Sequence, residues 1–183
     1  MEIYSLEIPE VKVIKPKKNL DNRGYFSEVY SNKSMKENGV DLNFLQDNQS
    51  LSVDINVVRG LHYQTEPFAQ DKLLRCLTGS LLDVAVDLRK DSPTFGKHIK
   101  KVISAENFEQ ILVPIGFAHG FVTLEENTTV LYKVTNFYSP NHDFGVFWND
   151  PELGIDWGID VSKAIVSEKD QKQPHFKDLK NLF

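Results

Sequence analysis

The chain of 183 residues is 40% hydrophobic and 26% charged, which is typical of an ordinary soluble globular protein. Its formal net charge of -5 argues against unspecific nucleic-acid binding, and its single cysteine, Cys76, excludes an internal disulfide framework and a cysteine-rich metal site. No apolar run is long enough to span a bilayer, and the start MEIYSLEIPE does not look like a signal peptide, so we expect a cytoplasmic protein with no membrane or nucleic-acid partner.

Short runs rich in Val, Ile, Leu and Phe, separated by Gly, Pro, Asn and Asp, predict strands along most of the chain. In chain order these runs are 10–16, 24–30, 44–53, 56–64, 72–88, 97–104, 109–115, 119–125 and 128–138. Within 72–88, the pair Gly79 and Ser80 predicts a hairpin turn. Only residues 31–40 predict a helix, which Gly39 is placed to end.

Regularly spaced short strands without intervening helices predict an antiparallel sandwich or barrel, and no repeat or linker interrupts the single domain expected over 1–183. After WNDPELGIDWG the pattern becomes polar, and Pro174 breaks it. We expect this tail to pack as turns and a short helix, because a long tail stays ordered only where it docks. A docked tail could carry Lys169 and Asp170 back to a site.

Residues 57–64, VVRGLHYQ, place polar side chains inside an apolar run. Arg59 lies three positions before His62, and Lys72 lies ten positions after it on the next predicted strand. A lone histidine on a strand is more often a core residue than a catalyst. However, neighbouring strands can bring these positions face to face, and two cations beside one imidazole are costly without an anion. The pattern therefore favours a site that binds an anionic ligand and moves protons.

His119, in PIGFAHGFVTL, is a second candidate, and the flanking Gly116 and Gly120 permit close backbone approach. A structural role for this histidine at the start of a strand explains the pattern equally well. The run GLHYQ has one histidine, with Gln64 where a metal-binding barrel would have a second. We therefore predict no metal site.

Two tyrosines in LYKVTNFYSP, Tyr132 and Tyr138, would ordinarily fill apolar space. A tyrosine in a pocket beside a lysine can also donate a proton, with its acidity tuned by its neighbours.

Nearer the N-terminus, DNRGYFSE places three further candidates around a glycine, although a surface hairpin explains them too. They are Arg23, Phe26 and Glu28. Gln46 and Asn48 in QDNQSLS are amides suited to hydrogen-bonding a base or a sugar.

These motifs carry a resemblance to the dTDP-4-dehydrorhamnose 3,5-epimerase family. It runs from about residue 3 to about 175 and rests on DNRGYFSE, QDNQSLS, VVRGLHYQ, AQDKLLR, DVAVDLRKDSPTFG, PIGFAHGF, LYKVTNFYSP, WNDPELGIDW and SEKD. The resemblance implies an all-β, cupin-like jelly roll with a few short helices. It also implies a homodimer with shared sites that uses neither metal nor cofactor. The implied substrate is dTDP-4-dehydro-6-deoxy-D-glucose, on the way to dTDP-L-rhamnose.

The resemblance also implies residue roles, motif by motif. His62 matches the base, Asp170 the carboxylate that orients it, Lys72 the lysine facing the C4 oxygen, and Tyr132 the proton donor. The positions that match nucleotide-sugar contacts are Arg23, Phe26, Glu28, Gln46, Asn48, Arg59, His119, Tyr138, Asp143 and Lys169, with some groups expected from the other subunit. Phe26 and Tyr138 resemble the aromatics that sandwich the thymine. Gly158 departs from the family, which often has proline there.

Three alternatives stay open at this point. One is an epimerase that inverts only C3 or only C5, and another is an enzyme for a different nucleotide sugar. The third is a binding protein without activity, which would be expected to lack the base, its carboxylate or the proton donor.

Overall fold

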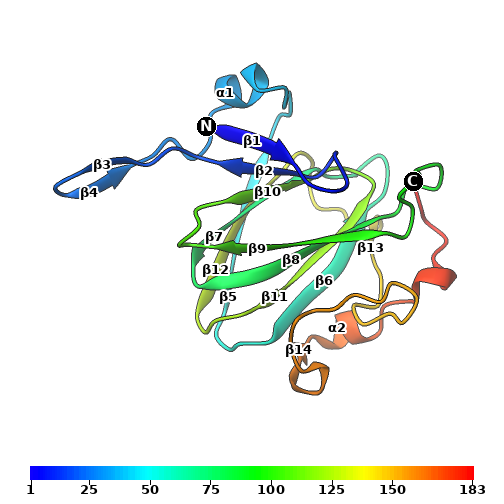
Figure 1. Cartoon of the computed structure of the whole chain (residues 1–183). Coiled ribbons are helices and arrows are strands. Elements are labelled where there is room, and N and C mark those ends of the chain that lie inside the picture. The colour runs from blue at the N-terminus through cyan, green and yellow to red at the C-terminus, as the bar shows by residue number, and fades with distance from the viewer.

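The computed structural model describes residues 1–183, and two antiparallel sheets make up most of it (Figure 1). The first sheet has the order β1 (Glu2–Ser5), β2 (Lys12–Lys15), β10 (Gln110–Val113), β7 (Lys72–Thr78), β12 (Thr128–Val134) and β5 (Gln46–Ser52). The second has the order β13 (Asp143–Gly145), β6 (Val57–Gln64), β11 (Phe117–Thr123), β8 (Ser80–Asp87) and β9 (His98–Ser104). A short strand, β14 (Ile165–Val166), pairs with β6 in parallel. The predicted antiparallel sandwich is therefore confirmed.

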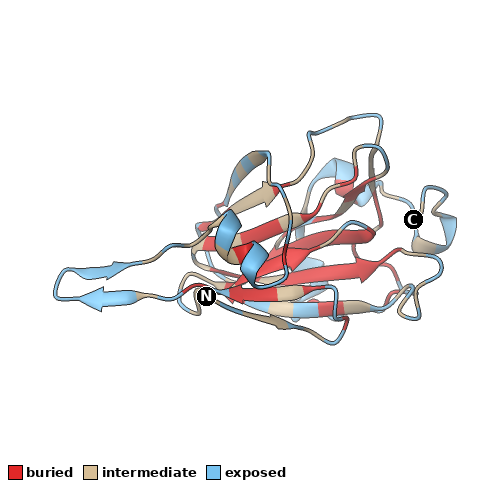
Figure 2. Cartoon of the chain, turned by 90° about the horizontal axis from the view of Figure 1, so that it is seen from above, coloured by how far each residue is buried: buried red, intermediate tan, exposed pale blue.

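The core lies between the facing sheets. Leu74 and Ile111 of the first sheet and Phe117 and Phe121 of the second belong to one buried cluster. Burying one such side chain stabilises the fold by about 2 kcal/mol. Figure 2 shows the buried strands in the middle of the molecule and exposed segments around them.

Two further layers cover the outer faces of the sheets. Met35 of α1 (Asn32–Glu37) packs on Leu73 of the first sheet, and Ser31 caps this helix. Gly39 follows the helix with a φ of 81°, as the sequence predicted. The second sheet is covered by the C-terminal segment, in which Trp148 and other apolar side chains pack. No helix is long and apolar enough to cross a membrane.

The C-terminal tail forms turns and short helices, as predicted. It contains η1 (Val161–Lys163), α2 (Glu168–Gln171) and η2 (Phe176–Asp178). In Figure 1, α2 and β14 lie beside β6, and α2 contacts β6.

An arm made of β3 (Asn19–Asp21) and β4 (Gly24–Phe26) projects from the body of the molecule (Figure 1). Every residue of its two strands is exposed. The strand predicted over 24–30 therefore ends at Phe26, because beyond it the chain leaves the hairpin and has no strand to pair with.

The predicted hairpin at Gly79 and Ser80 is wrong. Gly79 does separate two strands, β7 and β8, but these strands lie in different sheets. With a φ of 75°, Gly79 turns a corner from one layer to the other. The sequence pattern also gave no prediction for the short strands β1, β3, β13 and β14.

Candidate active site

A cavity of about 540 Å³ opens between the two sheets. Seven of the predicted site residues line it: Arg59, His62, Lys72, His119, Tyr132, Lys169 and Asp170. They come from β6, β7, β11, β12 and the tail, so segments far apart in the sequence meet here.

A bulge in β6 allows two predicted residues to share one face. His119 of β11 pairs with His62, but Phe121 pairs with Arg59, so β6 has one residue more than β11 between these pairs. In a regular strand, residues three apart point to opposite faces. The extra residue lets both Arg59 and His62 line the cavity.

Close backbone approach accompanies this bulge. A Cβ added to Gly60 would lie 2.6 Å from the Cα of Gly120, and a Cβ added to Gly120 would lie 2.7 Å from the backbone oxygen of Arg59. Neither position has room for a side chain. The two glycines therefore bring β6 and β11 together beside the two histidines.

His62 and Asp170 form the central pair of the site. Nε2 of His62 lies 2.6 Å from Oδ1 of Asp170, whose Oδ2 accepts a hydrogen bond from the backbone N–H of Gly60 at 3.3 Å. The Asp170 side chain is 5% exposed and that of His62 is 31% exposed, so the carboxylate lies behind the ring. Because Asp170 occupies Nε2, Nδ1 is the ring nitrogen left to accept a proton.

The local sequence places Asp170 at this point. Ser167 caps α2, and its Oγ accepts a hydrogen bond from the backbone N–H of Asp170 at 3.1 Å. Burial alone would raise the pKa of Asp170, but the hydrogen bond and charge of His62, with donors at Gly60 and Ser167, hold it below its ordinary value. Asp170 is therefore the charged partner of the pair.

Lys72 faces His62 from the other sheet. Its Nζ lies 3.5 Å from the backbone oxygen of His62. The prediction that these residues lie on neighbouring strands is wrong, because β6 and β7 belong to different sheets that pack face to face. Burial lowers the pKa of Lys72 to about 8, while Asp143 and Asp83 act to raise it. The ammonium therefore titrates close to neutral pH.

Tyr132 also lines the cavity from the first sheet, opposite β6. Burial raises its pKa, Arg59 opposes this rise and Asp143 adds to it. The phenol therefore stays protonated at neutral pH and can serve as a proton donor.

His119 has a partner that sequence reasoning missed. Its Nε2 lies 2.8 Å from both carboxylate oxygens of Asp83, a residue with no exposed surface. This leaves Nδ1 of His119 for the cavity. A charged residue within the apolar run SLLDVAVD was the available signal, because a buried carboxylate needs a partner.

The remaining predicted residues near the cavity lie along its rim and on β5. Asp143 accepts hydrogen bonds from Lys169 at 2.6 Å and from Tyr138 at 3.2 Å. On β5, Gln46 donates to Asn48 at 2.7 Å, and Asn48 pairs with Tyr132 in register. Paired residues share a face, so both amides point to the side of the sheet that forms the cavity.

Three predicted residues are not brought to this cavity within one chain. Arg23 and Phe26 belong to the arm, and the exposed Glu28 follows it. Arg23 instead pairs with Asp21 at 2.6 Å.

Besides Asp83, sequence reasoning missed other residues of the cavity wall. Ser50 and Phe121 line the cavity but gave no signal, because each fits an ordinary strand. Ser167 could have been found from the spacing of SEKD, a serine three residues before an acidic side chain, which is typical of a helix start. Ile165 lines the apolar part of the wall.

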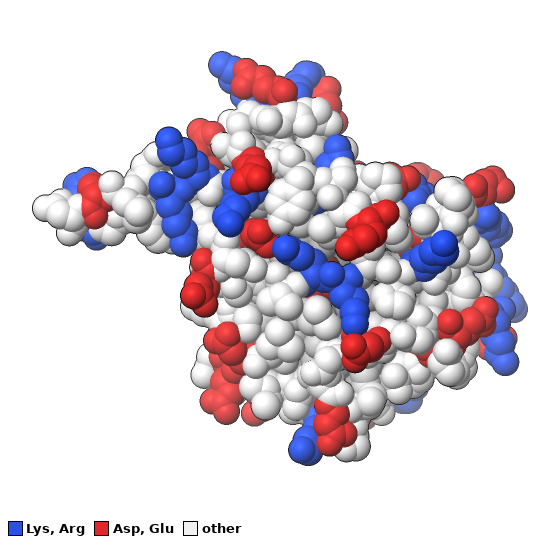
Figure 3. All heavy atoms as spheres, in the orientation of Figure 1, with Lys and Arg blue, Asp and Glu red and all other residues white.

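One face of the molecule shows mixed charge (Figure 3). On the face drawn in Figure 3, Lys and Arg alternate with Asp and Glu over the body of the molecule. This face offers no continuous basic surface of the kind that binds nucleic acid unspecifically.

Fold and site together define a cupin-like jelly roll whose cavity holds a histidine–carboxylate pair, a lysine and a tyrosine. The model of the family described as dTDP-4-dehydrorhamnose 3,5-epimerase matches residues 5–178. The chain therefore belongs to the dTDP-4-dehydrorhamnose 3,5-epimerase family, a family of isomerases, and the predicted family and fold class are confirmed.

Known proteins similar to this chain support the assignment. The dTDP-4-dehydrorhamnose 3,5-epimerase of Sinorhizobium fredii is 52% identical, over 98% of this chain and 91% of its own length. The crystal structure of the enzyme of that name from Elizabethkingia anophelis has a TM-score of 0.93 and 47% identity, and the match covers 99% of this chain and 98% of the other. A Legionella pneumophila 3,5-epimerase in complex with dTDP-4-keto-L-rhamnose has a TM-score of 0.92 and 39% identity, covering 98% and 94%.

Proposed function

We propose that this protein is a dTDP-4-dehydrorhamnose 3,5-epimerase that inverts C3 and C5 of dTDP-4-dehydro-6-deoxy-D-glucose. The observation that carries the proposal is that His62 and Tyr132 line one cavity from opposite sheets, with Lys72 beside His62. Inversion at a carbon requires a base on one face of the sugar and a proton donor on the other. This arrangement supplies both.

The chemistry follows from the ketone at C4. A hydrogen on the adjacent carbon can be removed because the resulting carbanion is delocalised onto the C4 oxygen as an enolate. Nδ1 of His62 accepts this proton, and Asp170 stabilises the imidazolium that forms. The ammonium of Lys72 stabilises the enolate oxygen, where negative charge develops. Tyr132 then donates its phenolic proton to the opposite face of the carbon, and solvent returns both side chains to their starting states.

The nucleotide part of the substrate requires cations, amides and aromatic surfaces. Arg59 and Lys169 suit the diphosphate, because charged donors bind phosphate oxygens strongly. Gln46 and Asn48 suit the edges of the base or sugar, and Tyr138 offers an aromatic face at the rim. His119 and Asp143 complete the set of contacts that we propose from within one chain.

The arm supports a homodimer in which each cavity is completed by the other subunit. Leu20 and Phe26 are 78% and 73% exposed, and apolar side chains so exposed on a projecting hairpin are typical of an interface. Arg23, Phe26 and Glu28 would then reach the neighbouring cavity. We propose that each subunit is a single domain over residues 1–183. We also propose that the dimer is cytoplasmic. A fully active monomer in sedimentation would contradict the shared site.

The test of the function is NMR of dTDP-4-dehydro-6-deoxy-D-glucose incubated with the protein in deuterated water. We expect deuterium at both C3 and C5 and a rhamno-configured product after coupled reduction. Deuterium at one carbon alone would replace the proposal with a mono-epimerase. No exchange at either carbon would overturn it and favour another nucleotide sugar or a protein that only binds.

A further inference from the structure

A second buried carboxylate, Asp150, holds the tail just beyond Asp170. Asp150 is 3% exposed. Its Oδ1 accepts the backbone N–H groups of Glu152 at 2.8 Å and Leu153 at 3.3 Å, within its own turn. Its Oδ2 accepts hydrogen bonds from Nδ1 of His175 at 2.7 Å and from the backbone N–H of Phe176 at 2.9 Å, both in the tail. One side chain therefore joins the turn after β13 to the segment after α2.

Neighbouring contacts tighten this junction. The backbone N–H of Phe147 donates to the oxygen of Pro174 at 2.8 Å, and the ring of Phe147 lies 5.2 Å from that of His175. Gln173 packs so closely on Gly145 that a Cβ there would lie 2.7 Å from its amide nitrogen. The tail is thus fixed at each position from 173 to 176.

The helix that carries Asp170 depends on such anchors. α2 has four residues, and an isolated helix of that length does not form in water. Upstream, β14 holds it to β6 through pairs such as Val166 with Val58. Downstream, the Asp150 junction holds it to β13, in which Gly145 pairs with His62 itself. α2 is therefore held at both ends by segments that pack on β6 or on its neighbour β13, and β6 carries His62.

From this geometry we propose that Asp150 is a positioning residue for the epimerisation. It fixes the backbone after α2 and so keeps the Asp170 carboxylate 2.6 Å from Nε2 of His62. The proposal rests on the proposed function, because its effect is expressed through the His62–Asp170 pair. Misplacing a catalytic group by about 1 Å can cost roughly 100-fold in rate.

The test uses Asp150→Asn, with Asp156→Asn as the matched control. Asp156 lies in the same segment and accepts hydrogen bonds from Gly158 and Lys100, and its carboxylate has no hydrogen bond to residues 173–176. We expect Asp150→Asn to lower kcat about tenfold with a smaller change in KM, since Lys169 moves with α2 but the proposed nucleotide contacts on the two sheets stay in place. The control should keep wild-type kcat. A folded Asp150→Asn protein with wild-type kcat would overturn the proposal.

A double-mutant cycle separates positioning from general stability. If Asp150 acts through Asp170, adding Asp150→Asn to Asp170→Asn should cost less than about twofold more in the residual rate. An equal loss in both backgrounds would mean that Asp150 serves only the fold. If Asp150→Asn fails to fold, His175→Ala replaces it in the same cycle, because His175 is half exposed and supplies one of the four donors.

A measurement without substrate keeps this proposal apart from the proposed function. Amide hydrogen exchange at Asp170, whose N–H is bonded to Ser167, should accelerate in Asp150→Asn and not in Asp156→Asn. Unchanged exchange would overturn the positioning role even if the wild-type protein shows no epimerase activity. Faster exchange with an inactive wild type would retain the junction and reject the function.

Discussion

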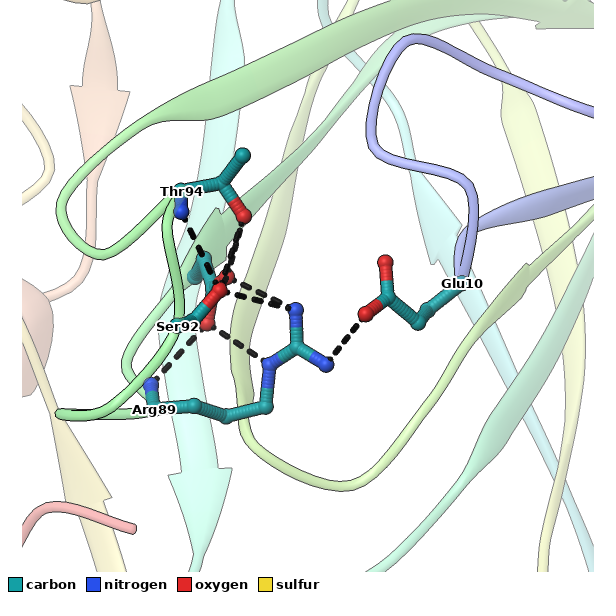
Figure 4. A network of polar contacts seen from close by, with 5 residues as sticks. Glu10, Arg89, Ser92 and Thr94 are labelled. Carbon is teal, nitrogen blue, oxygen red and sulfur yellow. Dashed lines mark hydrogen bonds and ion pairs between the residues drawn. The ribbon is translucent and has the colours of Figure 1, made fainter.

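Two buried carboxylates of this molecule, Asp87 and Asp170, differ in the hydrogen-bond donors that surround them. Figure 4 shows the network at the end of β8, with Arg89, Ser92 and Thr94 drawn together and Glu10 reaching Arg89 from the N-terminal segment. Asp87, at the centre of this network, has no exposed surface. Asp170 is almost as buried but lines an open cavity.

Asp87 has every acceptor position filled. Oδ1 accepts Nε and the backbone N–H of Arg89, both at 2.9 Å. Oδ2 accepts Nη2 of Arg89 at 2.8 Å and the hydroxyls of Ser92 and Thr94 at 2.6 Å each. Burial would raise the pKa of Asp87, but these donors lower it to about 2. Such a carboxylate stays charged at neutral pH.

Asp170 has two partners from β6, and the shorter contact is to an imidazole that can gain and lose a proton. The pKa of Asp170 is therefore held down in part by the hydrogen bond and charge of His62, and not only by fixed groups of the fold. The comparison teaches that burial alone does not mark a functional carboxylate. What distinguishes Asp170 is a titratable partner and an open cavity beside it.

The largest expected effect is on the epimerisation rate and comes from changing the His62–Asp170 pair. His62→Ala should lower the epimerisation rate by about 100- to 10,000-fold, because general bases contribute that much. Binding of dTDP should be largely retained. Rates of deuterium incorporation and calorimetric titration with dTDP measure the two quantities. Turnover close to wild type would remove His62 from the role of base.

Changing the network around Asp87 should lower stability and leave the rate unchanged. Asp87→Ala should lower the free energy of unfolding by about 3 kcal/mol, because it leaves the Arg89 guanidinium without its buried partner. The kcat of the folded fraction should be unchanged at 25 °C. Urea unfolding and steady-state kinetics test this pair of expectations. A loss of kcat without a loss of stability would make the network part of the site.

Low pH should reduce the difference in unfolding free energy between the wild type and Asp87→Ala. The pKa of Asp87 falls from 3.8 to about 2 on folding, so its ionisation stabilises the native state by about 2 kcal/mol. Because the folded pKa is depressed, this stability is present above pH of about 4 and is lost as the pH falls through 2. Unfolding free energies of wild type and Asp87→Ala, measured from pH 5 downward, should therefore converge. A constant gap would show that the ionisation of Asp87 is not the cause.

The smallest effect concerns Lys72, a half-buried cation that makes no ion pair with a carboxylate. Its pKa of about 8 predicts that kcat/KM of the free enzyme falls about tenfold between pH 7 and 9, as the ammonium that stabilises the enolate is lost. Lys72→Met should lower kcat/KM and flatten this limb. A profile with the same alkaline limb in both proteins would assign the limb to another group.

Much of the site could be predicted from the sequence because polar residues in apolar runs stand out. His62 and Lys72 were found in this way, Asp170 was found from the expected docking of the polar tail and by resemblance, and the three converge on one cavity. The bulge in β6 could not be foreseen, since a regular alternation would place Arg59 and His62 on opposite faces. Asp83 was missed because a single-sequence pattern does not reveal which strand lies next to it.

The strand pattern predicted the class of fold but not its connections. Nothing in the run 72–88 distinguishes a hairpin from a corner between two sheets, because Gly79 allows the backbone of either. The reach of the arm was equally hidden, since DNRGYFSE is compatible with a surface hairpin but does not show that Leu20 and Phe26 project from the body with exposed side chains.

The position of Asp170 in the chain has a consequence for synthesis on the ribosome. All fourteen strands precede residue 170, so the two sheets can pair before the carboxylate that serves His62 leaves the exit tunnel. A nascent or prematurely terminated chain that ends before α2 therefore contains His62 and Tyr132, the proposed base and proton donor, but not Asp170, the residue proposed to orient the base. On the proposed function, full activity therefore requires a chain translated at least through α2.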